Sequence, residues 1–253
     1  MSDTTDSNLA DEEFWAEDYL AGVELPARPD PTIAFERCLA AALERFAPVT
    51  AGAHVIEFGC APAKWLVFYA ERFGAQVSGI EYTEHGVALS RANLAATAIR
   101  GAIHHADVFT LAPAEHDLVL SLGFIEHFTD LEGAFARHVE FLAPRGLLVV
   151  GVPNYVGLLG AVQRWTDPAH LALHNLAAMQ PDLYARLAER HGLIVRSQRH
   201  LGGPDPVIIR LGRRRGRLVT SPLGIVRRPR AMDRVNHRWL SSYLLTVLQR
   251  PAR

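Results

Sequence analysis

Three acidic residues lie where successive predicted strands end, and they have the clearest chemical use in the chain. Glu57 lies in the first strand, Glu81 directly follows the second, and Asp107 follows the third. The carboxyl ends of parallel strands form the ligand crevice of an open sheet, so we expect these carboxylates to lie at one crevice. Glu81 comes 22 positions after Gly59, a spacing typical of an acid that holds a ribose diol. We expect Asp107 to reach an adenine amino group and Glu57 to order the loop from behind.

The turn after the first strand, Gly59-Cys-Ala-Pro-Ala-Lys64, indicates which adenosine cofactor fits. A dinucleotide needs several backbone N–H groups around its pyrophosphate, which a G-x-G-x-x-G turn supplies. Here a single glycine is present, and Pro62 has no N–H to donate. S-adenosylmethionine carries an ammonium, a sulfonium and a carboxylate but no phosphate, so the turn favours it over a dinucleotide. Lys64, the only lysine of the chain, either pairs with the cofactor's carboxylate or is a solvated residue at a helix start.

A Glu-His pair follows the fourth predicted strand and is the candidate for proton transfer. Methyl transfer from a sulfonium is an in-line displacement, so most of its catalysis is positioning. A hydroxyl acceptor also benefits from a base whose pKa is near neutrality, and histidine is the natural choice. We therefore expect His127 to be the first catalytic candidate and Glu126 the second. The alternative is a structural role, in which the pair caps the next helix or supports the cofactor loop.

Aromatic and polar residues gather after the fifth predicted strand, and together they suit the wall of a small-molecule pocket. The candidate substrate residues are Asn154, Tyr155, Trp165, His170 and His174. For each one alone, a core or surface role is the alternative. We expect no metal site, because the His170/His174 pair lacks an obvious third ligand.

The elements that must position these residues alternate between strand and helix over residues 53–152. Short apolar runs predict strands at 54–58, 76–80, 102–105, 117–121 and 146–152, with two more at 193–201 and 242–248. Helices are predicted from Thr32 to before Pro48, over 64–73, after a Thr83 cap, from a Thr129/Glu132 capping box to Leu142, and over 182–191. This alternation predicts an α/β fold: a Rossmann-like doubly wound sheet, mostly parallel with an antiparallel last strand, and helices on both faces.

We expect one main domain with added segments. Residues 1–31 form an acidic tail and cap segment with a short helix around Glu12–Leu20. Residues 32–202 form the cofactor-binding domain, with a lid at about 154–180. Residues 203–240 form an arginine-rich insertion. Residues 241–253 close the sheet, with a terminal helix as the alternative. We expect the insertion to be a solvated cover. The second alternative is a segment that binds an anionic ligand or a lipid surface, and nucleic-acid binding is the least favoured.

The bulk composition limits the class of protein. The chain has 253 residues, is 49% hydrophobic and has a formal net charge of -1, which suits one substantial core and argues against nucleic-acid binding. Its two cysteines are too few for a disulfide framework. The acidic N-terminus lacks the features of a secretory signal, and no run approaches the roughly 20 apolar residues of a membrane span. We therefore expect a cytoplasmic protein without a transmembrane segment.

Five segments in order resemble the successive motifs of class I S-adenosylmethionine-dependent methyltransferases: VIEFGCAPAKW (55–65), GIEYT (79–83), HADVF (105–109), DLVLSLGFIEHF (117–128) and LAPRGLLVVGVPN (142–154). The chain is most similar to the small-molecule branch that includes ubiquinone-biosynthesis O-methyltransferases, over about residues 53–200. Ala61 and Ala63 stand where that family usually has glycine.

The resemblance implies a substrate lid after the fifth strand and a methyl-transfer site after the fourth. The cofactor-binding residues expected from the motifs are Glu57, Gly59, Cys60, Ala61, Lys64, Glu81, Tyr82, Asp107, Val108, Ser121 and Gly123.

Three functional hypotheses follow from these residues. The first is an enzyme that methylates a small molecule, with a hydroxyl oxygen as the favoured acceptor atom. The second is a carbon-methylating relative that acts on lipids, because SLGFIEHF (121–128) is similar to a stretch of cyclopropane fatty acid synthases. The third is a binding protein that keeps the fold without catalysis, since a fold does not establish an activity.

Overall fold

The computed structural model describes residues 22–203 and 236–252, together with Leu9, Leu20, Asp205, Asp233 and Arg234. The predicted helix around 12–20 and most of the arginine-rich insertion lie outside the described residues. Among the residues that are described, no helix has both the length and the apolar character that crossing a membrane requires.

Strands and helices alternate through the first two-thirds of the chain, as the sequence pattern predicts. The strands are β1 (His54–Phe58), β2 (Gln76–Glu81), β3 (Gly101–His105), β4 (His116–Leu122), β5 (Leu142–Pro153), β6 (Ile194–Leu201) and β7 (Tyr243–Gln249). The α-helices are α1 (Ala34–Phe46), α2 (Lys64–Phe73), α3 (Glu84–Ala96), α4 (Leu131–Glu140), α5 (Leu158–Thr166), α6 (Pro168–Ala172) and α7 (Pro181–Arg190). Two short 3-10 helices are η3 (Ile125–His127) and η4 (Leu176–Met179).

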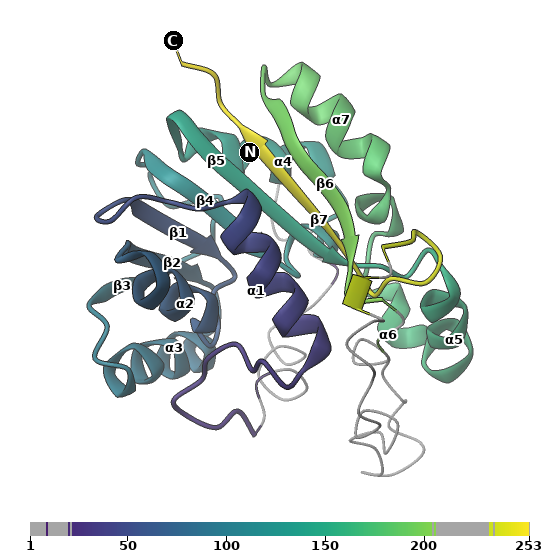
Figure 1. The fold of residues 1–253 in the computed structure, drawn as a ribbon, viewed down its shortest axis with the longest axis horizontal. Helices are drawn as coiled ribbons and strands as arrows, with labels where there is room; N and C mark the ends of the chain where they lie inside the picture. Colours follow the sequence, from purple (N-terminus) through teal and green to yellow (C-terminus); the bar gives the residue numbers. More distant parts are fainter. Residues whose placement is uncertain are drawn as a thin grey trace.

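The strands form one seven-stranded sheet in the order β3-β2-β1-β4-β5-β7-β6 (Figure 1). β1 pairs in parallel with both β2 and β4, so the chain reverses its direction of winding between β1 and β4. Such a reversal opens a crevice at the carboxyl ends of the two strands. The fold therefore directs the turn after β1 and the segment after β4 to the same edge of the sheet.

β7 runs between β5 and β6 and is antiparallel to both of them (Figure 1). Its buried positions alternate between the two faces, with Leu244 in one core and Leu245 in the other. The predicted closing strand and the mostly parallel doubly wound sheet are confirmed, and the alternative of a terminal helix is wrong.

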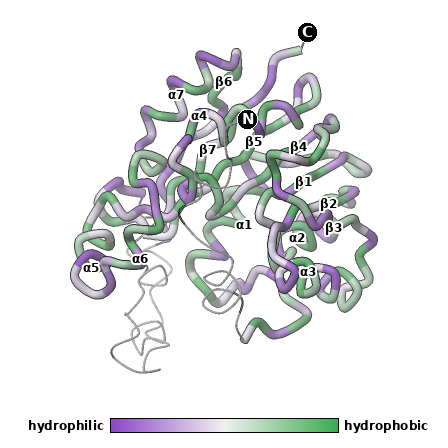
Figure 2. Tube along the Cα trace, turned by 180° about the vertical axis from the view of Figure 1, so that it is seen from behind, coloured by the Kyte–Doolittle hydropathy of each residue, from purple (hydrophilic) through white to green (hydrophobic). Residues whose placement is uncertain are grey.

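Each face of the sheet carries its own hydrophobic core, because successive strand side chains point to opposite faces. α1, α2 and α3 bury Leu39, Leu66 and Leu94 against one face. On the other face, α4 and α7 bury residues such as Phe135 and Tyr184. Hydrophilic and hydrophobic segments alternate along α7 (Figure 2), as one buried side of a surface helix requires. Central strands that are covered on both faces are mainly apolar, as in residues 147–150 of β5.

Two predicted boundaries differ from the structure around α4. The N-cap of this helix is Asp130, whose side chain accepts a hydrogen bond from the backbone N–H of Gly133 at 2.9 Å. The predicted Thr129/Glu132 capping box is therefore wrong, since aspartate one position later caps the helix by itself. The helix also ends at Glu140, and Leu142 already belongs to β5. The predicted Thr83 cap of α3 is confirmed by its hydrogen bond from the N–H of Gly86 at 3.0 Å.

Candidate functional site

The turn after β1 is held tightly against the neighbouring strand. The backbone N–H groups of Gly59 and Cys60 both donate to the carbonyl of Ile80, at 2.9 and 3.2 Å. Gly59 has a φ of 66°, and a Cβ there would lie 2.8 Å from the Phe124 ring. Glycine is therefore required at this position, both for its backbone conformation and for the approach of Phe124.

Ala63 ends this turn as the N-cap residue of α2, and its φ of 67° is also left-handed. Glycine adopts this conformation without strain, whereas the Cβ of alanine comes too close to the following carbonyl oxygen. Ala63 stands where class I methyltransferases usually have glycine, and the turn still has the left-handed conformation that glycine favours.

Four predicted cofactor residues meet around this turn: Glu57, Cys60, Lys64 and Glu81. Burial raises the pKa of the Glu57 carboxyl well above its usual value, Lys64 lowers it, and Glu81 raises it further. Burial also raises the pKa of the Cys60 thiol, and the carboxylates of Glu57 and Glu81 add to the effect. The carboxylates of Glu57 and Glu81 therefore lie close to each other and to Cys60, as expected of residues on the paired strands β1 and β2.

Glu81 is buried at the end of β2, at the start of the loop into α3. Its Oε1 accepts hydrogen bonds from the backbone N–H and the hydroxyl of Thr83, at 2.9 and 2.8 Å. Tyr82, between these two residues, is 56% exposed. The carboxylate is thus held in one orientation by the cap of α3, as a residue that binds a ribose diol must be.

Asp107 and Val108 lie beyond β3, one strand further along the sheet. Asp107 Oδ1 accepts a hydrogen bond from the N–H of Phe109 at 2.9 Å. The buried Val108 accepts a hydrogen bond at its carbonyl from Arg137 of α4, at 2.7 Å. These contacts fix the loop that follows β3.

Lys64 has a protein partner that the sequence does not reveal. Its ammonium group forms an ion pair with Glu36 of α1. Glu36 Oε2 also accepts a hydrogen bond from the backbone N–H of Asp30 at 2.7 Å. The ion pair joins α1 to the start of α2. The hydrogen bond from Asp30 adds the linker before α1 to this contact. Sequence reasoning missed Glu36, because no local pattern relates two residues 28 positions apart.

β4 contributes a buried polar atom to the edge of the crevice. Ser121 pairs with Phe58 across the β1–β4 ladder, and its hydroxyl is buried with no hydrogen-bond partner in the structure. Gly123 follows β4, and its N–H donates to the carbonyl of Gly151 at 2.8 Å. Phe124 then packs against Phe58 with ring centroids 6.1 Å apart. Sequence reasoning missed Phe124, because its contact with Gly59 joins two residues that are far apart in the chain.

Glu126 and His127 lie in η3 (Ile125–His127), and both are buried. His127 Nδ1 lies 2.8 Å from the carbonyl of Leu173, and its Nε2 lies 4.0 Å from Glu126 Oε1. Burial raises the pKa of Glu126 to about 8 and lowers the pKa of His127 to about 3. The neighbouring His174 lowers the pKa of His127 further. The ring is therefore neutral at physiological pH, and a pKa so far below neutrality makes it a weak proton acceptor.

Three of the predicted substrate residues come together beside this pair. The rings of His127 and His174 have centroids 4.7 Å apart, and Tyr155 packs on His174 at 5.1 Å. His170 lies against His174 at 4.8 Å, and its Nε2 is 3.4 Å from the Tyr155 hydroxyl. Tyr155 precedes α5, His170 lies in α6, and His174 follows α6. These three residues thus gather beside His127, in the segment after β4.

Two predicted substrate residues lie in other surroundings. The amide of Asn154 donates hydrogen bonds to the carbonyls of Arg238 and Ser241, both at 2.8 Å, and so fixes the approach to β7. Trp165 is 76% exposed on α5. Asn154 therefore holds the segment that leads into β7, and Trp165 presents most of its surface to solvent.

The comparisons with known proteins identify the family of the chain. The model of a family described as "Methyltransferase domain" matches residues 33–198. The chain belongs to the methyltransferase domain family. The resemblance found in the sequence motifs is confirmed by this match, which spans every strand from β1 to β5.

Two curated relatives share part of this methyltransferase domain. A ubiquinone biosynthesis O-methyltransferase of Rhodopseudomonas palustris (strain BisA53) is 30% identical over 124 residues, which cover 46% of this chain and 49% of the relative. A trans-aconitate 2-methyltransferase of Paracidovorax citrulli (strain AAC00-1) is 27% identical over 138 residues, covering 53% and 48%. The matches thus span about half the length of these curated relatives.

Among solved structures, geranyl diphosphate C-methyltransferase from Streptomyces coelicolor A3(2) has a similar fold. Its structure, in complex with Mg²⁺, geranyl diphosphate and S-adenosyl-L-homocysteine, gives a TM-score of 0.64 at 16% identity and covers 94% of this chain and 96% of that chain. At this identity the likeness supports the fold of the methyltransferase domain alone.

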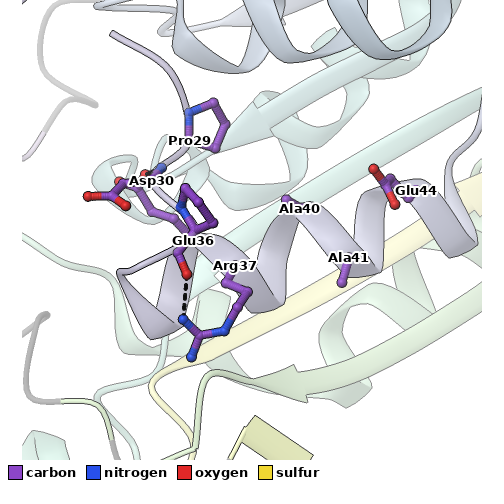
Figure 3. Close-up of a pocket in the computed structure, with 8 residues that line it drawn as sticks. Pro29, Asp30, Glu36, Arg37, Ala40, Ala41 and Glu44 are labelled. Atoms are coloured by element: carbon purple, nitrogen blue, oxygen red, sulfur yellow. Dashed lines mark hydrogen bonds between the residues drawn. The ribbon is translucent and has the colours of Figure 1, made fainter. Parts of the chain in front are cut away.

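A surface depression lies along α1, and none of the predicted site residues lines it (Figure 3). Arg37 at its rim donates a hydrogen bond to the carbonyl of Pro31 at 2.6 Å and forms an ion pair with Asp233 at 2.7 Å. Glu36 also lines this depression and is already paired with Lys64. Residues that line the depression therefore also make the contacts that attach α1 and the linker before it to the rest of the domain.

Proposed function

We propose that this methyltransferase domain transfers a methyl group from S-adenosylmethionine to a small-molecule acceptor, most favourably to a hydroxyl oxygen. The observation that carries the proposal is the turn after β1, where the buried carboxyl groups of Glu57 and Glu81 lie beside a single glycine. Membership of the methyltransferase domain family supports it. The S-adenosyl-L-homocysteine named in the Streptomyces structure supports the same class of cofactor.

The residues around the turn fit this cofactor chemically. Glu57 Oε2 and the hydroxyl of Ser121 are buried with no hydrogen-bond partner in the structure, and buried polar atoms of this kind call for a polar ligand. Pro62 offers no N–H, so the turn is poor at holding a pyrophosphate. Glu81 would hold the ribose hydroxyls, Asp107 the adenine amino group, and Glu57 would support the turn.

S-adenosylmethionine supplies a methyl group activated by its sulfonium. The chain's own contribution is to exclude water and to orient the acceptor, because an in-line displacement depends mainly on positioning. Glu126 and His127 lie in η3, directly after β4, and they would orient the acceptor. Tyr155, His170 and His174 would form the facing wall of the acceptor pocket.

Calorimetry tests the cofactor, and mass spectrometry tests the reaction. We expect the purified chain to bind S-adenosylmethionine and S-adenosylhomocysteine but not NAD. With methyl-labelled S-adenosylmethionine and a panel of hydroxylated metabolites, the label should appear on an acceptor oxygen. Binding of NAD in place of S-adenosylmethionine would contradict the proposal. Cofactor binding without turnover on any acceptor would favour a non-catalytic binding protein.

A carbon acceptor is the second candidate. It is supported by the fold shared with the geranyl diphosphate C-methyltransferase over nearly the full length of both chains, and by the SLGFIEHF segment over 121–128. The same labelling experiment separates the two candidates, because fragmentation of the product shows whether the label is bonded to carbon or to oxygen.

A further inference from the structure

The strongest unexplained feature of the molecule is a buried group of one carboxylate and two imidazoles, which we name the Glu-His-His cluster (Glu126, His127 and His174). One ligand atom from each residue lies within 4.8 Å of the others, and all three residues are buried. No other group of three such side chains with this geometry occurs among residues 22–203 and 236–252. The sequence pattern pairs His174 with His170 and offers no third ligand, whereas the fold pairs His174 with η3.

Both histidines of the cluster are held in the same tautomer. His127 Nδ1 lies 2.8 Å from the carbonyl of Leu173, and His174 Nδ1 lies 2.9 Å from the carbonyl of His170. A carbonyl oxygen only accepts, so each Nδ1 carries the proton and each Nε2 carries a lone pair. Metal-binding histidines commonly donate their other ring N–H to a backbone carbonyl in this way, which fixes the ring and makes it a better ligand.

Glu126 completes the donor set. Its side chain is 1% exposed, and neither carboxylate oxygen has a hydrogen-bond partner in the structure. A buried carboxylate without a partner is strongly destabilising, so such groups are normally protonated, paired or bound to a metal. His127 Nε2 lies 4.0 Å from Glu126 Oε1.

The backbone around the cluster is already held together. The N–H of Asn175 donates to the carbonyl of Glu126 at 2.6 Å, and the Asn175 amide donates to the carbonyl of Phe128 at 3.0 Å. η3 and the segment that carries His174 are therefore joined independently of any ligand. A site supported in this way keeps its donors close to a binding geometry.

We propose that Glu126, His127 and His174 bind a divalent first-row transition-metal ion, with zinc as the representative ion. Two imidazole nitrogens and one carboxylate oxygen are a common donor set for such ions. In a tetrahedral site with bonds of about 2.0–2.1 Å, two donors lie about 3.3 Å apart. The 4.0 Å between His127 Nε2 and Glu126 Oε1 therefore has to close by less than about 1 Å, which a small rotation of the side chains achieves. Three protein ligands leave one position open for water or for an oxygen of another ligand.

The test measures metal binding by the full chain without a histidine tag. After removal of metal with a chelator, we expect the protein to take up one Zn²⁺ per chain, and added Co²⁺ to give the visible absorption of a bound ion. Glu126→Gln and His174→Gln should each weaken Zn²⁺ binding at least about tenfold. His170→Gln is the matched control, since it is one helical turn from His174 and lies outside the cluster. It should retain the metal.

Two outcomes would overturn the site. One is a wild-type protein that takes up no metal under these conditions, and the other is an equal loss of metal in His170→Gln. Circular dichroism shows whether each variant folds. If a variant does not, zinc-edge X-ray absorption of the wild-type protein decides, because two imidazoles and an oxygen are expected and a sulfur ligand would contradict the assignment. None of these measurements uses S-adenosylmethionine, so their failure leaves the proposed methyl transfer standing.

Discussion

The two halves of the candidate site are built in different ways. The crevice around Glu57, Gly59 and Glu81 comes from strands and turns that are consecutive in the chain, and its residues lie at adjacent strand ends. The Glu-His-His cluster joins η3 to a residue 47 positions later, through α5 and α6. The first half follows from the order of parallel strands. The second depends on the path of the segment that contains α5 and α6. Variants that affect one half and leave the other unchanged can test this difference.

The largest effect is expected at the cluster. His127→Asn keeps a donor for the carbonyl of Leu173 but removes Nε2. We expect turnover to fall at least about 100-fold, the scale of a lost positioning contact, while the affinity for S-adenosylmethionine stays within about twofold. Steady-state kinetics and calorimetry check the two quantities. If cofactor binding is lost instead, His127 has a structural role.

Gly79→Ala should disturb the crevice through packing. A Cβ at Gly79 would lie 2.4 Å from Cys60 Sγ and 2.7 Å from Cys60 Cβ. We expect the free energy of unfolding to drop by about 1–3 kcal/mol, as is typical of overpacking, measured by urea denaturation. Adding Cys60→Gly should recover part of this loss. Simply additive losses in the double variant would contradict a direct contact between the two positions.

Glu81→Gln tests the ribose-binding role. The amide can still accept from Thr83 but loses the charge, so we expect the affinity for S-adenosylmethionine to fall by more than about 1 kcal/mol. Calorimetry measures the change. Glu84→Gln is the matched control, since this exposed residue lies three positions later at the start of α3, and it should leave the affinity unchanged. Equal affinities for all three proteins would refute the assignment.

Glu57 adds a pH dependence to the stability of the crevice. Burial raises the pKa of its carboxyl in the folded protein, so the folded state binds this proton more tightly than the unfolded chain does. The free energy of unfolding therefore decreases as the pH rises from the unfolded pKa toward the raised folded value. Relative to Glu57→Gln, the wild type should lose stability in urea denaturation as the pH rises above about 4.3, the usual value of an unfolded glutamate. A constant difference would show that the pKa is not raised.

The smallest effect is expected for Ala63→Gly. The left-handed φ of 67° strains alanine and not glycine, and this relief offsets the loss of a buried methyl group. We expect the free energy of unfolding to change by less than about 0.5 kcal/mol. Ala42→Gly, in the interior of α1, should cost about 1 kcal/mol or more. An equal cost at both positions would contradict the role of the left-handed turn.

Much of the fold could be predicted from the sequence because the relevant signals are local. β1 and α2 have the predicted bounds, and Thr83 caps α3 as its spacing from Gly86 indicates. The start of α4 was mispredicted because two polar residues in succession, Thr129 and Asp130, both suit a cap. Their competition is decided by backbone geometry rather than by residue type.

The sequence by itself determined the order of strands and helices, the turn with one glycine, and the acids at the strand ends. Each of these depends on periodicity or on a few neighbouring residues. The tertiary structure alone decided that Lys64 pairs with Glu36, that Phe124 covers Gly59, and that His174 joins Glu126 and His127. These contacts link segments far apart in the chain, and such pairs are set by packing over the whole sheet rather than by any local spacing.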